Sequence, residues 1–175
     1  LETLEDPKEK IIIIHNHGQN SFDGAQKQCI SYGQLRNKAS LVNQEIKGKK
    51  IAVYNLCTNK LKGDMPLKWW IQKDKPYVGK TKLDYRVEAN LSLVEKFVSM
   101  GVPRKQIFIT GHSCGGLTTL LFFSRYPDKA AGGISYMHAC FGKLSKQYKV
   151  KKLGKQEALA KLSLIHISEP TRQAE

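Results

Sequence analysis

Apolar residues along the chain form short continuous runs that alternate with longer stretches of helical spacing. Four of the runs are rich in β-branched and aromatic residues, which is typical of strands buried on both faces of a parallel sheet. These expected strands cover residues 10–18, 49–57, 106–110 and 132–140.

Two of the intervening stretches predict well-defined helices. In the first, Asp84 is an expected N-cap and Gly101 an expected stop, and apolar residues recur at helical spacing at Val87, Leu91, Val94 and Val98. The second covers residues 114–126, where the chain is apolar on nearly all sides before Pro127, so this helix must be buried. A further helix is expected within residues 23–46, ended by Gly48. Alternating strands and helices predict an α/β fold, with a parallel sheet flanked by helices.

A long connection between Cys57 and Leu83 interrupts this alternation and contains Trp69 and Trp70. Connections of this length often carry function. The two tryptophans are therefore candidates for lining a substrate pocket, and the alternative is that they anchor local packing.

The formal net charge of +14 raises the question of a nucleic-acid partner. Only five of the 29 basic residues are Arg, and the lysines are scattered along the chain. Because proteins that read bases and phosphates favour Arg, we interpret the lysines as solvated faces and keep nucleic-acid binding only as a minor alternative.

Several features limit what can be inferred about compartment and cofactors. No apolar stretch is long enough to span a bilayer. Because the chain starts at Leu1, we expect its native N-terminus to lie upstream, and we leave its localisation open. The oligomeric state is also left open. Its four cysteines are far apart and form no C-x-x-C pair. We therefore expect buried free thiols and no metal or other cofactor.

The last fourteen residues, 162–175, differ from the rest of the chain because they contain no lysine. Residues 162–172 resemble the translation of a sequencing-library adapter. We therefore expect residues 162–175 to be a non-native tail and the native sequence to continue past Lys161. The alternative is a natural C-terminal strand.

The motif Gly111-His112-Ser113-Cys114-Gly115 gives the clearest chemical signal, because it follows an expected strand and opens an expected helix. This is the setting of a nucleophile elbow, a sharp turn that exposes a serine Oγ above the sheet. The glycines leave room for the turn, and the helix N-terminus favours developing negative charge. Ser113 is therefore the candidate nucleophile.

With this elbow and the segment His15-Asn16-His17-Gly18-Gln19-Asn20, residues 10–140 resemble the α/β-hydrolase superfamily, closest to its dienelactone-hydrolase-like and esterase-like branches. The resemblance implies a small-molecule acyl substrate. It also implies an oxyanion hole formed by the backbone N–H groups of Cys114 and Gln19, with Asn20 as the near alternative to Gln19.

The histidines allow more than one interpretation. His15 and His17 alternate at a strand end and could bind a metal ion, although no H-E-x-x-H motif or carboxylate at another strand end accompanies them. We favour His17 as part of the oxyanion turn. His112 is expected to pack or to contact the substrate edge, and His138 to line the pocket or to be a satisfied, partly buried histidine.

A serine nucleophile also needs a histidine base and a carboxylate, in the order serine, acid, histidine for this superfamily. After Ser113, residues up to 161 offer only Asp128, Glu157 and His138, whose positions or order do not fit. We therefore expect residues 1–161 to be a partial domain of a serine esterase that has lost its acid and histidine by truncation. The alternative is a non-catalytic protein of the same fold that binds a ligand or a partner.

Overall fold

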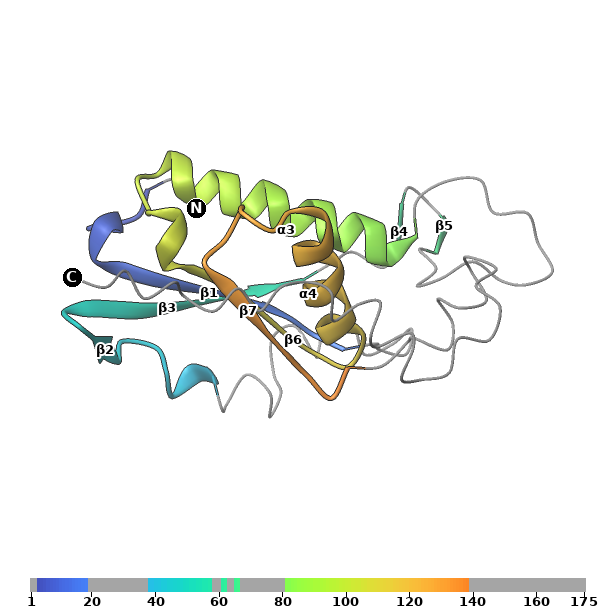
Figure 1. The fold of residues 1–175 in the computed structure, drawn as a ribbon, viewed down its shortest axis with the longest axis horizontal. Coiled ribbons are helices and arrows are strands. Elements are labelled where there is room, and N and C mark those ends of the chain that lie inside the picture. The colour runs from blue at the N-terminus through green and yellow to red at the C-terminus, as the bar shows by residue number, and fades with distance from the viewer. Residues whose placement is uncertain (1–2, 19–37, 58–60, 63–64, 67–80, 139–175) are drawn as a thin grey trace, which may run out of the picture.

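The computed structural model describes residues 3–18, 38–57, 61–62, 65–66 and 81–138 (Figure 1). Its elements are, in chain order, η1 (Pro7–Glu9), β1 (Lys10–Asn16), β2 (Glu45–Ile46), β3 (Lys49–Leu56), β4 (Leu61–Lys62), β5 (Met65–Pro66), α3 (Lys82–Ser99), η2 (Arg104–Gln106), β6 (Ile107–His112), α4 (Cys114–Arg125) and β7 (Gly132–Tyr136). The strands β4 and β5 form a small antiparallel pair of their own.

Five strands make the main sheet, in the order β2-β3-β1-β6-β7. The strands β3, β1, β6 and β7 run parallel, and only the short β2 is antiparallel. Asn16 pairs with Leu56 on one side and with Gly111 on the other. The carboxyl ends of the parallel strands therefore lie on one edge of the sheet.

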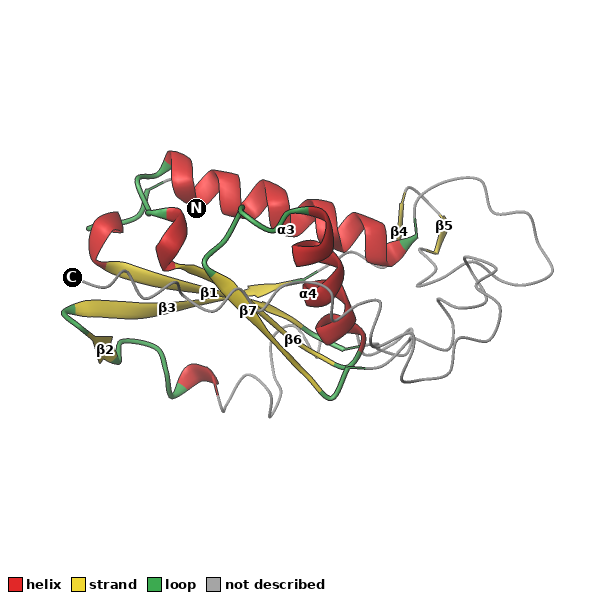
Figure 2. Ribbon diagram, viewed as in Figure 1, coloured by secondary structure: helices red, strands yellow, loops and turns green. Residues whose placement is uncertain are grey.

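The helices α3 and α4 pack on the same face of this sheet (Figures 1 and 2). Ile12 and Ile14 of β1 share a buried cluster with Val87 of α3 and Phe122 of α4. Because side chains alternate along a strand, His15 points to the opposite face. The expected α/β class, a parallel sheet flanked by helices, is confirmed.

The helix α3 begins two residues earlier than the predicted cap. Thr81 is the N-cap, and its hydroxyl accepts a hydrogen bond from the Asp84 backbone N–H. Asp84 in turn accepts a hydrogen bond from the Thr81 backbone N–H, which completes a capping box. The expectation that Asp84 itself was the N-cap is wrong, whereas Gly101 follows the helix with a φ of 98°, as a stop should.

Gly48 has a different role from the predicted one. It does not follow a helix; it closes the hairpin between β2 and β3 together with Lys47. Both residues have positive φ values, 50° and 74°, as a two-residue type I′ turn requires. Of the helix expected within residues 23–46, residues 23–37 lie outside the described part.

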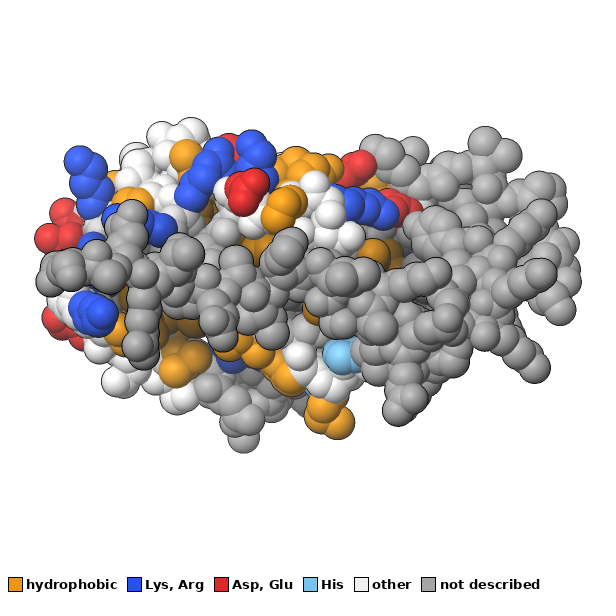
Figure 3. Space-filling view, viewed as in Figure 1, with side chains coloured by type: hydrophobic (Ala, Val, Ile, Leu, Met, Phe, Trp, Pro, Cys, Tyr) orange, Lys and Arg blue, Asp and Glu red, His pale blue; other side chains and the backbone are white. Residues whose placement is uncertain are grey.

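The surface of the described residues carries its charge in a dispersed form. On the face that Figure 3 shows, Lys and Arg side chains are spread over several elements and form no continuous stripe. Among the described residues, no helix combines the length and the apolar character that a membrane crossing needs.

Candidate active site

Ser113 occupies the sharp turn between β6 and α4 that the motif predicts. Its φ of 56° and ψ of −125° are a conformation that residues other than glycine rarely adopt. Such strain is typical of a nucleophile elbow. The positive φ at Ser113 therefore agrees with the predicted nucleophile elbow.

Two glycines make this turn possible. A Cβ on Gly111 would lie 2.1 Å from the backbone oxygen of Gly115, and a Cβ on Gly115 would lie 2.1 Å from the backbone oxygen of Asn16. Real Cβ atoms do not approach backbone oxygens so closely. Only glycine at these two positions lets α4 start directly against the end of β1.

The Ser113 side chain is left available by this arrangement. Its backbone N–H donates to the Tyr136 carbonyl at 3.3 Å, which ties the turn to the end of β7. Ser113 is half-buried, and its hydroxyl does not cap α4. Within the described part of the chain, no hydrogen bond joins Ser113 Oγ to a histidine.

The segment His17-Gly18 lies directly against this serine. A Cβ added to Gly18 would be 3.1 Å from Ser113 Cβ. His17 is 4 % exposed, and its Nδ1 donates to the Gly18 carbonyl at 2.7 Å. The loop that the resemblance assigns to the oxyanion hole thus begins beside Ser113.

Burial lowers the pKa of His17, the positive charges of Arg86 and Lys82 in α3 add to this effect, and the resulting pKa is about 4. His17 is therefore neutral at pH 7. Arg86 is itself fully buried, and burial lowers its pKa to about 9. Sequence analysis did not find Arg86, because a single Arg on a helix carries no signal of burial.

The side chain of His15 contacts other groups than the side chain of His17 does. Its Nδ1 contacts Thr110 Oγ1 at 3.1 Å and its Nε2 contacts Lys38 Nζ at 3.0 Å. The two histidines of the alternating pattern therefore direct their nitrogens to different partners. Among the described residues, no group of three or more His, Cys, Asp or Glu side chains is placed to hold a metal ion.

The rings of His112 and Tyr136 lie beside the elbow, with centroids 5.5 Å apart. His112 ends β6 and is half-buried. The strand β7 ends at Tyr136, earlier than predicted, so His138 follows the strand instead of belonging to it. Its Nδ1 lies 3.5 Å from Ser135 Oγ.

The expectation of free thiols is wrong for both cysteines in the described residues. Cys57 and Cys114 are disulfide-bonded. Cys57 directly follows the end of β3 and Cys114 is the first residue of α4, so both lie at the carboxyl edge of the sheet. Spacing along the sequence carried no sign of these disulfides, because disulfides join residues that only the fold brings together.

Several predicted site residues fall outside the described part of the chain: Gln19, Asn20, Trp69 and Trp70. The oxyanion-hole geometry between Gln19 and Cys114 is therefore untested. Asp128 follows the C-terminal end of α4 and is exposed, as expected for a residue away from the elbow.

No family model matches the chain, and no curated protein matches its sequence. Among solved structures, it is similar to a phospholipase/carboxylesterase from Dyadobacter fermentans DSM 18053, with 16% identity and a TM-score of 0.49 over 78% of this chain and 57% of that one. It is also similar to SOBER1 of Arabidopsis thaliana, with 16% identity and a TM-score of 0.41 over 80% of this chain and 70% of that one. The chain thus spans little more than half the length of the first of these proteins. From its own strand order and its strained strand-to-helix turn, the described part has an α/β-hydrolase-type parallel sheet flanked by helices.

Proposed function

We propose that the chain is the nucleophile-bearing part of a serine hydrolase that cleaves an ester or a related acyl bond through Ser113. The observation that carries this proposal is the backbone of Ser113, held at a positive φ between a buried strand and a buried helix. Proteins keep such strain where it serves function. The half-buried hydroxyl, which caps no helix, supports the same role.

In the proposed reaction, Ser113 Oγ attacks the carbonyl carbon of the ester while a histidine base takes its proton. The C–O bond to the leaving alcohol then breaks, and the alcohol takes that proton from the histidine. The acyl group stays on Ser113 until water attacks it, which releases the carboxylic acid and restores the serine hydroxyl.

The negative charge that develops on the carbonyl oxygen would be held by backbone N–H groups. We assign these to Cys114, at the start of α4, and to Gln19, with Asn20 as the alternative. The close packing of Gly18 on Ser113 supports this assignment, because it places the start of that loop beside the nucleophile. Each donor of this kind is typically worth about 2.7–4 kcal/mol in the transition state.

The base and its carboxylate are proposed to lie in native sequence beyond Lys161, with residues 162–175 as a non-native tail. On this account the 175-residue chain alone retains little turnover. Loss of the triad partners leaves only the contribution of binding and the oxyanion hole, on the order of 10³–10⁴ over water in well-studied triads.

A non-catalytic, ligand-binding role is the second candidate. Both candidates are consistent with the absence of a hydrogen bond between Ser113 Oγ and a histidine among the described residues. The intact gene separates the two candidates, since the catalytic account requires an acid and then a histidine after Lys161.

The test is hydrolysis of 4-nitrophenyl acetate by the intact parent protein, its Ser113→Ala variant and the 175-residue chain. We expect turnover by the parent, a loss of at least about a thousandfold in kcat on Ser113→Ala, and little turnover by the short chain. A parent protein that binds the ester without cleaving it would support the non-catalytic role, whereas an alanine variant with full activity would contradict Ser113 as the nucleophile.

A further inference from the structure

We propose that the disulfide of Cys114 holds the nucleophile elbow in its working shape, so that the hydrolase turns over at its full rate only while this bond is intact. This inference rests on the proposed function and adds a redox dependence to it. It gives the Cys114 side chain a positioning role, beside the role assigned to the backbone N–H of the same residue. The observation behind it is the place of the disulfide, one residue after Ser113.

Cys114 belongs both to the strained turn and to the helix that follows. It comes directly after Ser113, whose φ of 56° and ψ of −125° are unfavourable, and it is the first residue of α4. A strained backbone persists only where the surrounding structure holds it in place. Motion at Cys114 is therefore passed on to Ser113 and to the N–H that we assign to the oxyanion hole.

The first turn of α4 has little rigidity of its own. Gly115 and Gly116 follow Cys114 directly, and glycine loses more conformational freedom in a helix than any other residue. Gly115 cannot be replaced without moving the chain, because a Cβ there would meet the Asn16 carbonyl. The rigidity of this turn must therefore come from its neighbours.

Hydrogen bonds restrain the carbonyl groups of this turn. The Leu117 N–H donates to the Ser113 carbonyl at 3.1 Å, and the Thr118 hydroxyl donates to the Cys114 carbonyl at 2.9 Å. The first N–H groups of a helix, in contrast, have no partner within the helix. The disulfide adds a covalent restraint at the residue whose N–H must be held.

The Cys114 side chain lies inside the protein, where its bond ties two parts of the backbone together. Cys114 is 1 % exposed. A disulfide brings the Cα atoms of its two cysteines to within about 7 Å of each other. A second part of the chain is therefore fixed directly beside the elbow. Loss of the bond frees that part and the first turn of α4 from each other.

Reduction by a dithiol, such as dithiothreitol, breaks this restraint. One thiolate of dithiothreitol attacks a sulfur of the bond, and its second thiolate then closes a ring on the mixed disulfide. Two electrons and two protons pass to the protein, which carries two thiols afterwards, and dithiothreitol leaves as its cyclic disulfide. The proposal predicts that this form of the hydrolase is slow although it is still folded.

The kinetic test uses 4-nitrophenyl acetate and the intact parent protein in its oxidised and reduced forms. Cys114→Ala is the variant that keeps the backbone N–H and cannot form the bond. We expect kcat to fall about tenfold to a hundredfold in the reduced protein and in Cys114→Ala, with a much smaller change in KM. Reoxidation should restore the turnover of the wild type. An unchanged kcat in both overturns the proposal.

The partner cysteine supplies a variant that leaves Cys114 itself unchanged. Peptide mapping without reductant identifies it among Cys29, Cys57 and Cys140, and alanine at that position should cause the same fall in kcat. Phe97→Leu is the control for lost stability, because Phe97 is buried near the C-terminal end of α3. It should lower the melting temperature and keep kcat. An equal loss of kcat in Phe97→Leu, or a free Cys114 thiol in the mapping, overturns the proposal.

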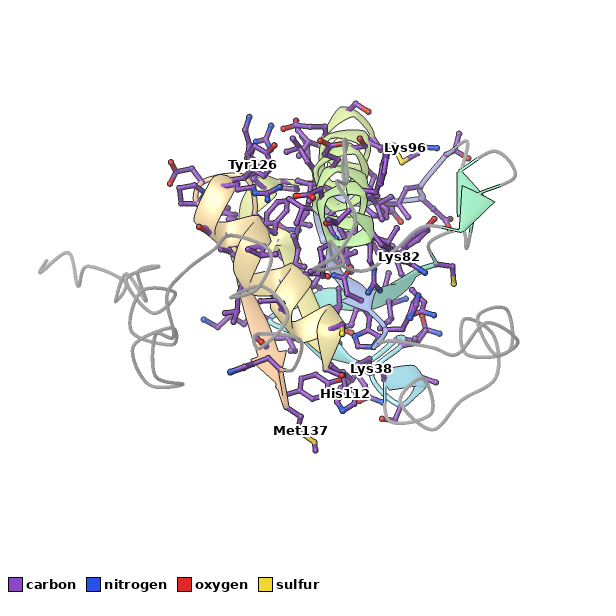
Figure 4. All side chains as sticks on the ribbon, turned by 90° about the vertical axis from the view of Figure 1, so that its right-hand side faces the viewer. Lys38, Lys82, Lys96, His112, Tyr126 and Met137 are labelled. Carbon is purple, nitrogen blue, oxygen red and sulfur yellow. The ribbon has the colours of Figure 1, made fainter. Side chains whose placement is uncertain are left out.

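A second measurement needs no turnover. Amide hydrogen exchange in the 175-residue chain compares Leu117, whose N–H bonds to the Ser113 carbonyl, with Tyr126, whose N–H bonds to the Phe122 carbonyl at 2.8 Å. In Figure 4, His112, just before the elbow, and Tyr126 lie at opposite ends of α4. We expect reduction to speed exchange at Leu117 about tenfold or more relative to Tyr126.

Equal changes at the two amides, or no change at Leu117, overturn the positioning role of the disulfide. Failure of the proposed hydrolase has a different result, because the oxidised parent protein would then show no Ser113-dependent cleavage of any ester. The exchange at Leu117 reports the hold of the disulfide on the turn independently of that outcome.

Discussion

Asn16 at the end of β1 and Asn90 in α3 exchange two side-chain hydrogen bonds, of 3.1 and 2.9 Å, and both residues are fully buried. Asn16 also donates to the Thr110 carbonyl, and Asn90 donates to the Arg86 carbonyl. This amide pair joins α3 to the strand end that packs on the elbow.

We expect Asn90→Leu to lower the free energy of unfolding by about 1–3 kcal/mol, because it leaves the buried Asn16 amide without its partner. Urea unfolding measures this change. Ser92→Ala, at an exposed position of the same helix, is the matched control and should change stability by less than about 0.5 kcal/mol. Equal effects of the two substitutions would show that the amide pair does not stabilise the fold.

The contact between Gly115 and Asn16 predicts a second effect on stability. Gly115→Ala would place a Cβ against the Asn16 carbonyl, so α4 or β1 must shift, at a cost of about 1–3 kcal/mol or more. A Cβ on Gly132 meets nothing within 4 Å, which makes Gly132→Ala the matched control. Thermal unfolding should show a lower melting temperature for Gly115→Ala but not for Gly132→Ala. If both variants melt alike, the tight packing of the elbow on β1 is contradicted.

The pKa of His17 predicts how stability depends on pH. Its folded value of about 4 lies below the ordinary value of 6.5, so between these values the unfolded chain binds more protons than the folded one. Stability from His17 is therefore complete above about pH 6.5 and is lost as the pH falls towards 4, by up to about 3 kcal/mol.

Urea unfolding between pH 7 and pH 4 measures this dependence. His17→Gln keeps an N–H donor for the Gly18 carbonyl but cannot titrate, so its stability should fall less steeply over the same window. The same slope in the wild type and in His17→Gln would mean that His17 is not held neutral by the fold.

The disulfides at Cys57 and Cys114 predict a dependence of stability on reductant. We expect reduction to lower the free energy of unfolding by about 2–5 kcal/mol for a single bond. Alkylation of the protein in denaturant, with and without reductant, followed by mass spectrometry, tests the bonding itself. Modification of Cys57 or Cys114 without reductant would contradict it.

Much of the sheet and the elbow could be predicted because their signals are local. The apolar run at residues 10–16 indicates a strand that is covered on both faces. Gly111 and Gly115 flank Ser113 at the spacing that the turn requires. The predicted helix at α3 had its N-cap misplaced by three residues, because Thr81 and Asp84 both suit a cap and only their mutual hydrogen bonds decide between them.

The parts that could not be predicted depend on contacts between distant segments. Nothing near Lys38 distinguishes it from the other lysines, and only the fold brings it to His15 and Tyr136. The disulfides of Cys57 and Cys114 are hidden for the same reason. The separate directions of His15 and His17 follow from the end of β1 at Asn16, one residue before His17, where strand alternation no longer applies.

The most direct test of the central claim is covalent labelling of the intact parent protein with a fluorophosphonate, which reacts with activated serines, followed by mapping of the modified peptide. Ser135 is an internal comparison, because its Oγ lies 3.5 Å from His138 Nδ1 but it sits in an ordinary strand. The account predicts modification of Ser113 alone, with labelling abolished by Ser113→Ala and kept by Ser135→Ala. Labelling of Ser135 or of another serine, or ester hydrolysis that survives complete modification of Ser113, would contradict it.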